Sequence, residues 1–277
     1  VTGVQTCALP IYIGVVGSSV TSGSDMNLSA GNDVNILSSQ STSTQILKTK
    51  KSGFLSSSSH SVNSYDLTNV ASNLSSTDGN LNITTGNNTN LIASQLSSGL
   101  DANVNARGQV NILSDKDVHE FHETKKTSGF SANPLDYVTG GFSGYKDNKS
   151  SHDIITTTNV GSQIAATSNI SSNSNDDTSI AASNLNAGGN INIASNANVN
   201  LISSSDTFFE ETKKSSQSQA WMAMHDVGTS KSTVVVDKIT ANNVTINATQ
   251  NINVDYKASG NLAQSLDTLA QQPEFKY

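Results

Sequence analysis

The chain has 277 residues and a mass of 28.9 kDa, and its 15 Lys and Arg against 22 Asp and Glu give a net charge of −7. Ser, Asn and Thr supply 106 residues, whereas charged residues make up 13% and aromatic residues 5%. This composition argues against a compact enzyme core and, because charge is scarce, against a disordered chain. The acidic balance argues against a nucleic-acid-binding protein, which would show a basic face. No apolar run approaches the roughly 18 residues of a membrane span.

The first eleven residues, VTGVQTCALPI, resemble the translation of a sequencing adapter. They contain the only cysteine, Cys7. We therefore expect residues 1–11 to be an artefact and the authentic chain to begin at about Tyr12. That chain has no cysteine, so neither disulfides nor thiol redox chemistry can contribute to it.

Segments rich in Asn and Ser alternate apolar and polar residues with a period of two, as in GNINIASNANVNL at 189–201. Such alternation over four to six residues predicts strands with one buried face. The predicted core is the apolar set of these segments: Leu81, Ile83, Val110, Ile112, Ile191, Ile193, Val199 and Leu201.

Gly and Asn recur between these strands, for example at Gly31-Asn32, Gly79-Asn80 and Gly86-Asn87. Both residues tolerate positive φ, which favours tight corners. Short strands and such corners, recurring about every 20 residues, are typical of a parallel β-helix. The sequence therefore predicts an all-β chain, a right-handed parallel β-helix over 12–258, with stacked Asn forming amide ladders along its corners.

Three stretches interrupt the alternation, at about 45–70, 116–160 and 206–232. Each contains a lysine pair, starting at Lys50, Lys125 and Lys213, so that the pairs are 75 and 88 residues apart. We expect these stretches to be protruding loops or hairpins, here called excursions. Most aromatic residues of the chain lie in these excursions. Either the aromatic side chains cover the side of the helix, or they form a contact surface for a partner or a lipid interface. The candidate contact residues are Phe121, Phe130, Tyr137, Phe142, Tyr145 and Trp221.

One acid and histidine cluster, DKDVHEFHE at 115–123, contains His119 and His122. Zinc hydrolases place two His four residues apart on a helix, whereas these are three apart and on a strand would point to opposite faces. No nucleophile elbow or phosphate loop occurs either. We expect no catalytic residue, no cofactor and no metal, and hence no enzyme.

Residues 259–277 are expected to form a linker or tail, partly helical near 261–272, that leads to a further C-terminal region. This segment ends in LAQQPEFKY.

The units GNDVNILSS, GNLNITTG and GGNINIAS, together with KKSGF and KKTSGF, resemble the haemagglutinin-repeat region of two-partner-secretion exoproteins. These include filamentous haemagglutinins and the exoproteins of contact-dependent growth inhibition. LAQQPEFKY is similar to a segment that precedes the pretoxin and toxin parts of such proteins. The resemblance covers roughly 20–277.

This resemblance implies a secreted or cell-surface protein of a Gram-negative bacterium, exported by an outer-membrane partner transporter. It implies a non-enzymatic segment that supports toxin delivery to neighbouring bacteria; the alternative is an adhesin that binds host cells or supports biofilm. The expected partners are therefore the transporter and a target-cell or host-cell surface, with no nucleic acid and no integral membrane span.

Overall fold

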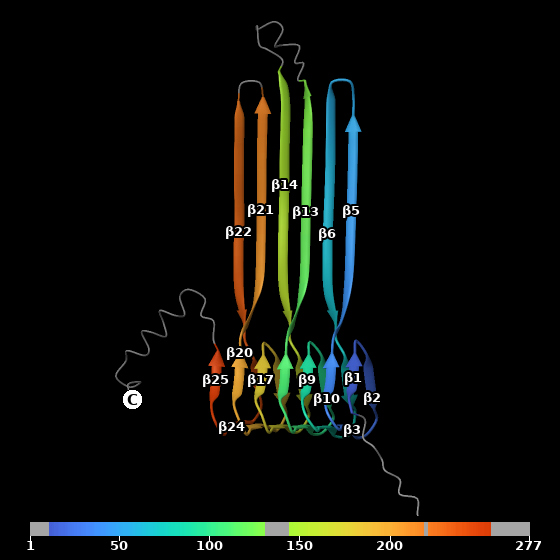
Figure 1. The fold of residues 1–277 in the computed structure, drawn as a ribbon, viewed down its shortest axis with the longest axis vertical. Coiled ribbons are helices and arrows are strands. Elements are labelled where there is room, and N and C mark those ends of the chain that lie inside the picture. The colour runs from blue at the N-terminus through green and yellow to red at the C-terminus, as the bar shows by residue number, and fades with distance from the viewer. Residues whose placement is uncertain (1–10, 131–143, 219–220, 256–277) are drawn as a thin grey trace, which may run out of the picture.

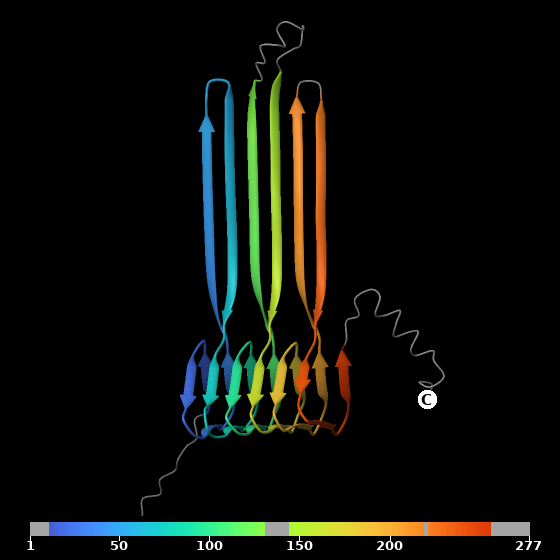
Figure 2. The same cartoon turned by 180° about the vertical axis from the view of Figure 1, so that it is seen from behind.

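The computed structural model describes residues 11–130, 144–218 and 221–255, and within them the chain is all-β. Three parallel sheets wrap into a short solenoid, from which a fourth, antiparallel sheet projects (Figures 1 and 2). Each coil adds one strand to each parallel sheet, in register with the strand of the coil below. The expected parallel β-helix with hairpin excursions is thus confirmed.

The parallel sheets are named here A, B and C, and each coil passes through them in the order B, C, A. Sheet A contains β1 (Ile13–Val16), β4 (Val34–Leu37), β9 (Thr89–Ile92), β12 (Val110–Leu113), β17 (Thr178–Ala181), β20 (Val199–Ile202) and β25 (Ile252–Asp255). Sheet B contains β2 (Ser19–Ser22), β7 (Asn73–Ser76), β10 (Gln95–Ser98), β15 (Gln163–Ala166), β18 (Asn184–Ala187) and β23 (Lys238–Thr240). Sheet C contains β3 (Met26–Ala30), β8 (Leu81–Thr85), β11 (Ala102–Ala106), β16 (Ile170–Ser174), β19 (Asn190–Ser195) and β24 (Asn243–Ala248).

The core is a narrow column of stacked aliphatic side chains, because every second residue of each strand points inward. In sheet C, for example, Ile83, Val104, Ser172 and Ile193 occupy equivalent positions in successive coils. Seven of the eight predicted core residues are buried: Leu81, Ile83, Val110, Ile112, Ile191, Ile193 and Val199. The eighth, Leu201, packs against the core and is partly buried.

Asparagines form amide ladders on the outer face of the strands, rather than only along the corners as the sequence suggested. Asn82 Nδ2 donates to Asn27 Oδ1 at 2.9 Å, and Asn103 Nδ2 donates to Asn82 Oδ1 at the same distance. The strands are the better location because in-register parallel pairing places identical side chains directly above one another.

The corner glycines also act differently from the expectation. Among the described glycines only Gly17 has a positive φ, of 52°. Instead, neighbouring coils approach too closely for a side chain: a Cβ on Gly86 would lie 2.0 Å from the carbonyl oxygen of Gly31. Glycine is thus required at this corner by the contact between coils and not by backbone conformation.

A second ladder follows the corner between sheets A and B. The residue before each of the first five sheet-B strands is a serine, exposed at Ser18 and buried in the later coils. The amide N–H of each of the first four donates to the hydroxyl of the serine one coil further on. The members are Ser18, Ser72, Ser94, Ser162 and Ser183. These hydroxyls satisfy backbone groups that would otherwise be buried without a partner.

The excursions leave from this same corner in every second coil, after β4, β12 and β20. Each is a long hairpin, and together they form one six-stranded sheet, here called the excursion sheet. Its strands are β5 (Ser39–Ser52) with β6 (Ser56–Val70), β13 (Asp115–Phe130) with β14 (Tyr145–Val160), and β21 (Ser204–Ser218) with β22 (Met222–Val235). In two of the intervening coils the corner is short and contains Ala93 or Ala182, with φ of 45° and 44°.

The two-coil period explains why the hairpins join. Strands in both kinds of sheet are spaced about 4.8 Å apart, so two coils rise by the same distance as the width of one two-stranded hairpin. Neighbouring hairpins therefore meet edge to edge, β6 on β13 and β14 on β21, with antiparallel pairing over most of their length.

One of the two alternatives from the sequence was that the excursions cover the side of the solenoid. Instead they stand away from it as a single layer (Figure 1). Their strands begin at residues 39, 115 and 204, of which the first is earlier than the expected 45. Strand β5 is polar and lacks the two-residue alternation, so the sequence did not reveal its start. The expected helical tail, 259–277, lies outside the described residues.

Candidate contact surface

The excursion sheet is exposed on both faces, and its two halves have opposite charge. The half next to the solenoid, here the proximal half, comprises residues 39–47, 62–70, 115–123, 152–160, 204–212 and 227–235. The described residues of the distal half are 48–61, 124–130, 144–151, 213–218 and 221–226.

The proximal half contains nine carboxylates and two lysines, and the described distal half contains nine lysines and two aspartates. With histidines neutral, the halves carry −7 and +7. The proximal carboxylates are Asp66, Asp115, Asp117, Glu120, Glu123, Asp153, Asp206, Glu210 and Glu211. The distal lysines are Lys48, Lys50, Lys51, Lys125, Lys126, Lys146, Lys149, Lys213 and Lys214. The surface is therefore strongly polarised along the strands.

Ion pairs mark the boundary between the halves. Lys125 Nζ lies 2.8 Å from Glu123 Oε1, and Lys213 Nζ lies 2.7 Å from Glu211 Oε2. The hydrogen bond from Lys125, aided by His60, lowers the pKa of Glu123 below its usual value. In the same way the carboxylate of Glu211 raises the pKa of Lys213. Both shifts favour the charged forms of Glu123 and Lys213 and so support the polarity of the sheet.

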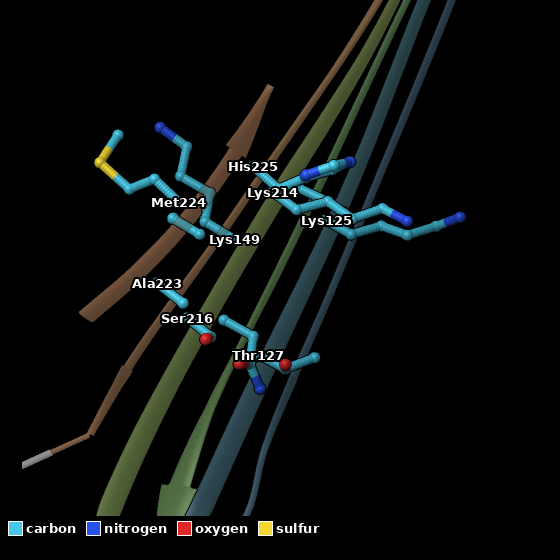
Figure 3. Close-up of a pocket in the computed structure, with 11 residues that line it drawn as sticks. Lys125, Thr127, Lys149, Lys214, Ser216, Ala223, Met224 and His225 are labelled. Atoms are coloured by element: carbon cyan, nitrogen blue, oxygen red, sulfur yellow. The ribbon is translucent and has the colours of Figure 1, made fainter. Parts of the chain in front are cut away.

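A hollow of about 500 Å³ lies in the distal half, over the second and third hairpins. Lys125 on β13, Lys214 on β21 and His225 on β22 project toward the same side of the sheet, whereas Met224 and Lys149 point to the other (Figure 3). Strand β14 lies between β13 and β21. The remaining lining of the hollow is mostly Ser, Thr and Asn, which can donate hydrogen bonds. This hollow suits an anionic group.

Aromatic residues lie at the hairpin ends. Phe130 and Tyr145 form the last pair of β13 and β14, with ring centroids 5.5 Å apart and an interplanar angle of 67°. Trp221 lies at the end of the third hairpin, with 81% of its surface exposed. Phe121 lies instead in the proximal half, where its ring meets the edge of His152. The candidates Tyr137 and Phe142 lie outside the described residues.

The candidate residues chosen from sequence omitted Phe54, which is fully exposed at the end of the first hairpin. A signal was present, since Phe54 follows Lys50-Lys51 in KKSGF much as Phe130 follows Lys125-Lys126 in KKTSGF. The repeat therefore places an aromatic residue in the distal half of the sheet after each of these two lysine pairs.

Four of the described histidines pair with carboxylates on neighbouring strands. His119 pairs with Asp66 and His122 with Asp153, on opposite faces of the sheet as a strand requires. The other two pairs are His60 with Glu123, at 2.7 Å, and His152 with Glu210, at 2.8 Å. Three of the four pairs connect different hairpins. No three metal-ligating side chains come together within the described ranges.

Neighbouring hairpins are also joined at their bases. The backbone N–H of Asn69 donates to Asp117 Oδ1 at 2.7 Å, and that of Asn159 donates to Asp206 Oδ1 at the same distance. The amide nitrogens of both asparagines donate to the same carboxylates. The excursion sheet is thus fixed as one unit above the solenoid.

Together, the stacked coils and the two-coil excursions define a β-solenoid repeat protein with a projecting, charge-polarised sheet. The family model described as Hemagglutinin repeat matches residues 12–58 and 53–221, and the chain belongs to this family. It is the hemagglutinin-repeat region of a filamentous haemagglutinin-type exoprotein, and the family is one of structural repeats and not of enzymes. No curated protein and no solved structure matches the chain. In the part of the chain that the structure describes, no helix is long and apolar enough to span a membrane.

Proposed function

We propose that this segment supports toxin delivery to neighbouring bacteria in contact-dependent growth inhibition, acting as a non-enzymatic contact element of a secreted or surface exoprotein of a Gram-negative bacterium. In this proposal an outer-membrane two-partner-secretion transporter exports the exoprotein, and the partner of the segment is the target-cell surface. The observation that carries the proposal is the excursion sheet, which stands away from the solenoid (Figure 2). Its basic half and exposed aromatic residues lie on the side away from the coils.

The resemblance of LAQQPEFKY, residues 269–277, to a segment preceding pretoxin regions favours delivery. The alternative is an adhesin that binds host cells or supports biofilm. The basic hollow favours this second candidate, because lysines and hydroxyls are also suited to acidic surface glycans.

The solenoid itself shows how to remove an excursion without disturbing the coils. Between β9 and β10 the chain reads Ile92-Ala93-Ser94-Gln95, a corner with no excursion. Replacing residues 114–161 by a single alanine would join Leu113 to Ser162 in the same way and keep the serine ladder. A matched control replaces the second hairpin with the sequence of the first, 39–70, which restores the number of strands.

The alanine variant is introduced into the full-length parent, and attachment and killing of target cells are measured separately. Retained attachment with lost killing supports delivery, and recovery in the hairpin-swap control assigns the effect to the sheet. Lost attachment supports the adhesin. If neither attachment nor killing changes, the excursion sheet has no contact role and the proposal is wrong.

A further inference from the structure

The six strands of the excursion sheet share one row near their distal ends; residues 131–143, between β13 and β14, lie outside the described part of the chain. Pairing register places Ser52, Ser57, Ser128, Asp147, Gln217 and Met222 in a single row, one residue from each strand. The distal ends of the described strands consequently lie at about one level, on the side of the sheet away from the solenoid (Figure 1). At or beyond this row six large apolar side chains are exposed, namely Phe54, Leu55, Phe130, Tyr145, Trp221 and Met222. They are here called the apolar rim.

The basic half lies directly behind the apolar rim, on both faces of the sheet. By the pairing register, Lys51, Lys125, Lys146 and Lys214 are on one face, and Lys48, Lys50, Lys126, Lys149 and Lys213 are on the other. A protein partner seated on one face would leave about half of these charges unused. A layer into which the edge of the sheet dips can contact both faces at once.

We propose that the apolar rim and the basic half dock on the surface of a bilayer containing anionic phospholipid. Aromatic and apolar side chains favour the boundary between headgroups and acyl chains, and each lysine near an anionic surface contributes about 1 kcal/mol. The basic distal half is attracted to such an anionic membrane, and the acidic proximal half is repelled by it. The strands therefore stand away from the membrane, with the solenoid roughly 50 Å from it, since a strand of some 15 residues spans that length.

This inference rests on the proposed function, for which it names the physical partner, and it can be tested apart from killing. Trp221 is the only tryptophan of the chain and lies in the apolar rim, so its fluorescence reports docking directly. The full chain is mixed with vesicles of phosphatidylcholine and phosphatidylglycerol in equal parts, or with vesicles of phosphatidylcholine alone, and flotation is measured in parallel. We expect a blue shift and flotation with the anionic vesicles, both weakened by added salt.

Two sets of variants separate the contributions. Changing Lys50, Lys126 and Lys214 to Gln is expected to weaken partitioning about fivefold per lysine, and Phe54→Ser with Phe130→Ser is expected to abolish the blue shift. The matched controls change the proximal Lys116 and Lys231 to Gln, or the proximal Phe209 to Ser, and are expected to bind as the parent does. All these side chains are at least partly exposed, and circular dichroism verifies that the variants fold.

Equal binding by distal and proximal variants, or equal flotation with both vesicle types, would overturn the inference. So would the absence of vesicle binding in a chain that binds a soluble polyanion such as inositol hexakisphosphate, since the basic half would then serve a different ligand. If vesicles are not bound but the excursion-deleted parent still fails to kill, the docking inference fails while the proposed function stands.

Discussion

The backbone N–H of Ser183 donates to Oδ1 of Asp237 at 2.9 Å, so that a carboxylate occupies the position held by a serine hydroxyl in the preceding coils. Asp237 precedes β23 just as Ser183 precedes β18, and it therefore continues the serine ladder with a charged member. Burial raises the pKa of Asp237 to about 6, although N–H groups of Ser183 and Ile202 act in the opposite direction. The ladder thus contains one group that titrates near neutral pH.

Replacing Asp237 with serine should make the ladder uniform and remove a pH dependence. The folded-state pKa of about 6 exceeds the unfolded value of 3.8, so the folded chain binds the proton more tightly. The contribution of Asp237 to stability is therefore full below about pH 4, declines as the pH rises to about 6, and stays low above.

We expect Asp237→Ser to be about 1 kcal/mol more stable than the parent at pH 7.5, after allowance for solvent screening of a partly exposed group. The difference should close near pH 4. Urea unfolding at several pH values measures it, and Asp237→Asn, which also lacks the charge, should behave similarly. A difference that does not change with pH would show that the carboxyl titrates normally.

The outer ladder of sheet A has one gap. Asn35, Asn90 and Asn111 are linked by amide hydrogen bonds of 2.8 and 2.9 Å, and Asn253 donates to Asn200 at 2.8 Å. Between these two groups stands Ser179, whose short side chain leaves a contact of 3.4 Å from Asn200.

We expect Ser179→Asn to complete this ladder and stabilise the chain by about 0.5–1 kcal/mol, the usual net contribution of a hydrogen bond. Thermal unfolding measures the gain, and Ser179→Asp is the matched control, since its carboxylate cannot donate to Asn111. If both variants raise the melting temperature equally, the gain does not come from the amide hydrogen bond.

The sequence revealed the solenoid because its pattern is local. Residues such as Ile191 and Ile193 alternate with asparagine on one strand, and the alternation alone assigns the buried face. The excursion sheet was harder to predict from the sequence, because its paired strands are distant in the chain. His60, for example, meets Glu123 only because two coils rise by the width of one hairpin. For the same reason the charge polarity emerges only when the lysine pairs near 50, 125 and 213 are aligned in space.

The histidines at 119 and 122 provide a test of the non-metal assignment. Both are exposed and pair with single carboxylates, and exposed pairs of this kind contribute little. We expect His119→Ala and His122→Ala to leave stability, zinc content and function of the parent unchanged. Metal analysis of the purified chain with and without both substitutions measures this, and loss of a bound metal from the double variant would contradict it.

The final prediction concerns the core column of sheet C, in which Ser172 lies between Val104 and Ile193. Its side chain is fully buried, and among the described residues its hydroxyl has no hydrogen-bond partner. Because an unsatisfied buried hydroxyl costs about 1–3 kcal/mol, Ser172→Ala should stabilise the chain by about 1 kcal/mol.

The neighbouring Ile193→Asp places an unpaired charge in the same column and should unfold the adjoining coils, whereas Ile193→Val should cost about 1 kcal/mol. Urea unfolding followed by circular dichroism compares the three variants. The decisive comparison is that Ser172→Ala stabilises the chain whereas Ile193→Asp destabilises it. These opposite changes in unfolding free energy follow only if both side chains face the same dry interior. A destabilising Ser172→Ala or a harmless Ile193→Asp would mean that this face of sheet C is open to water.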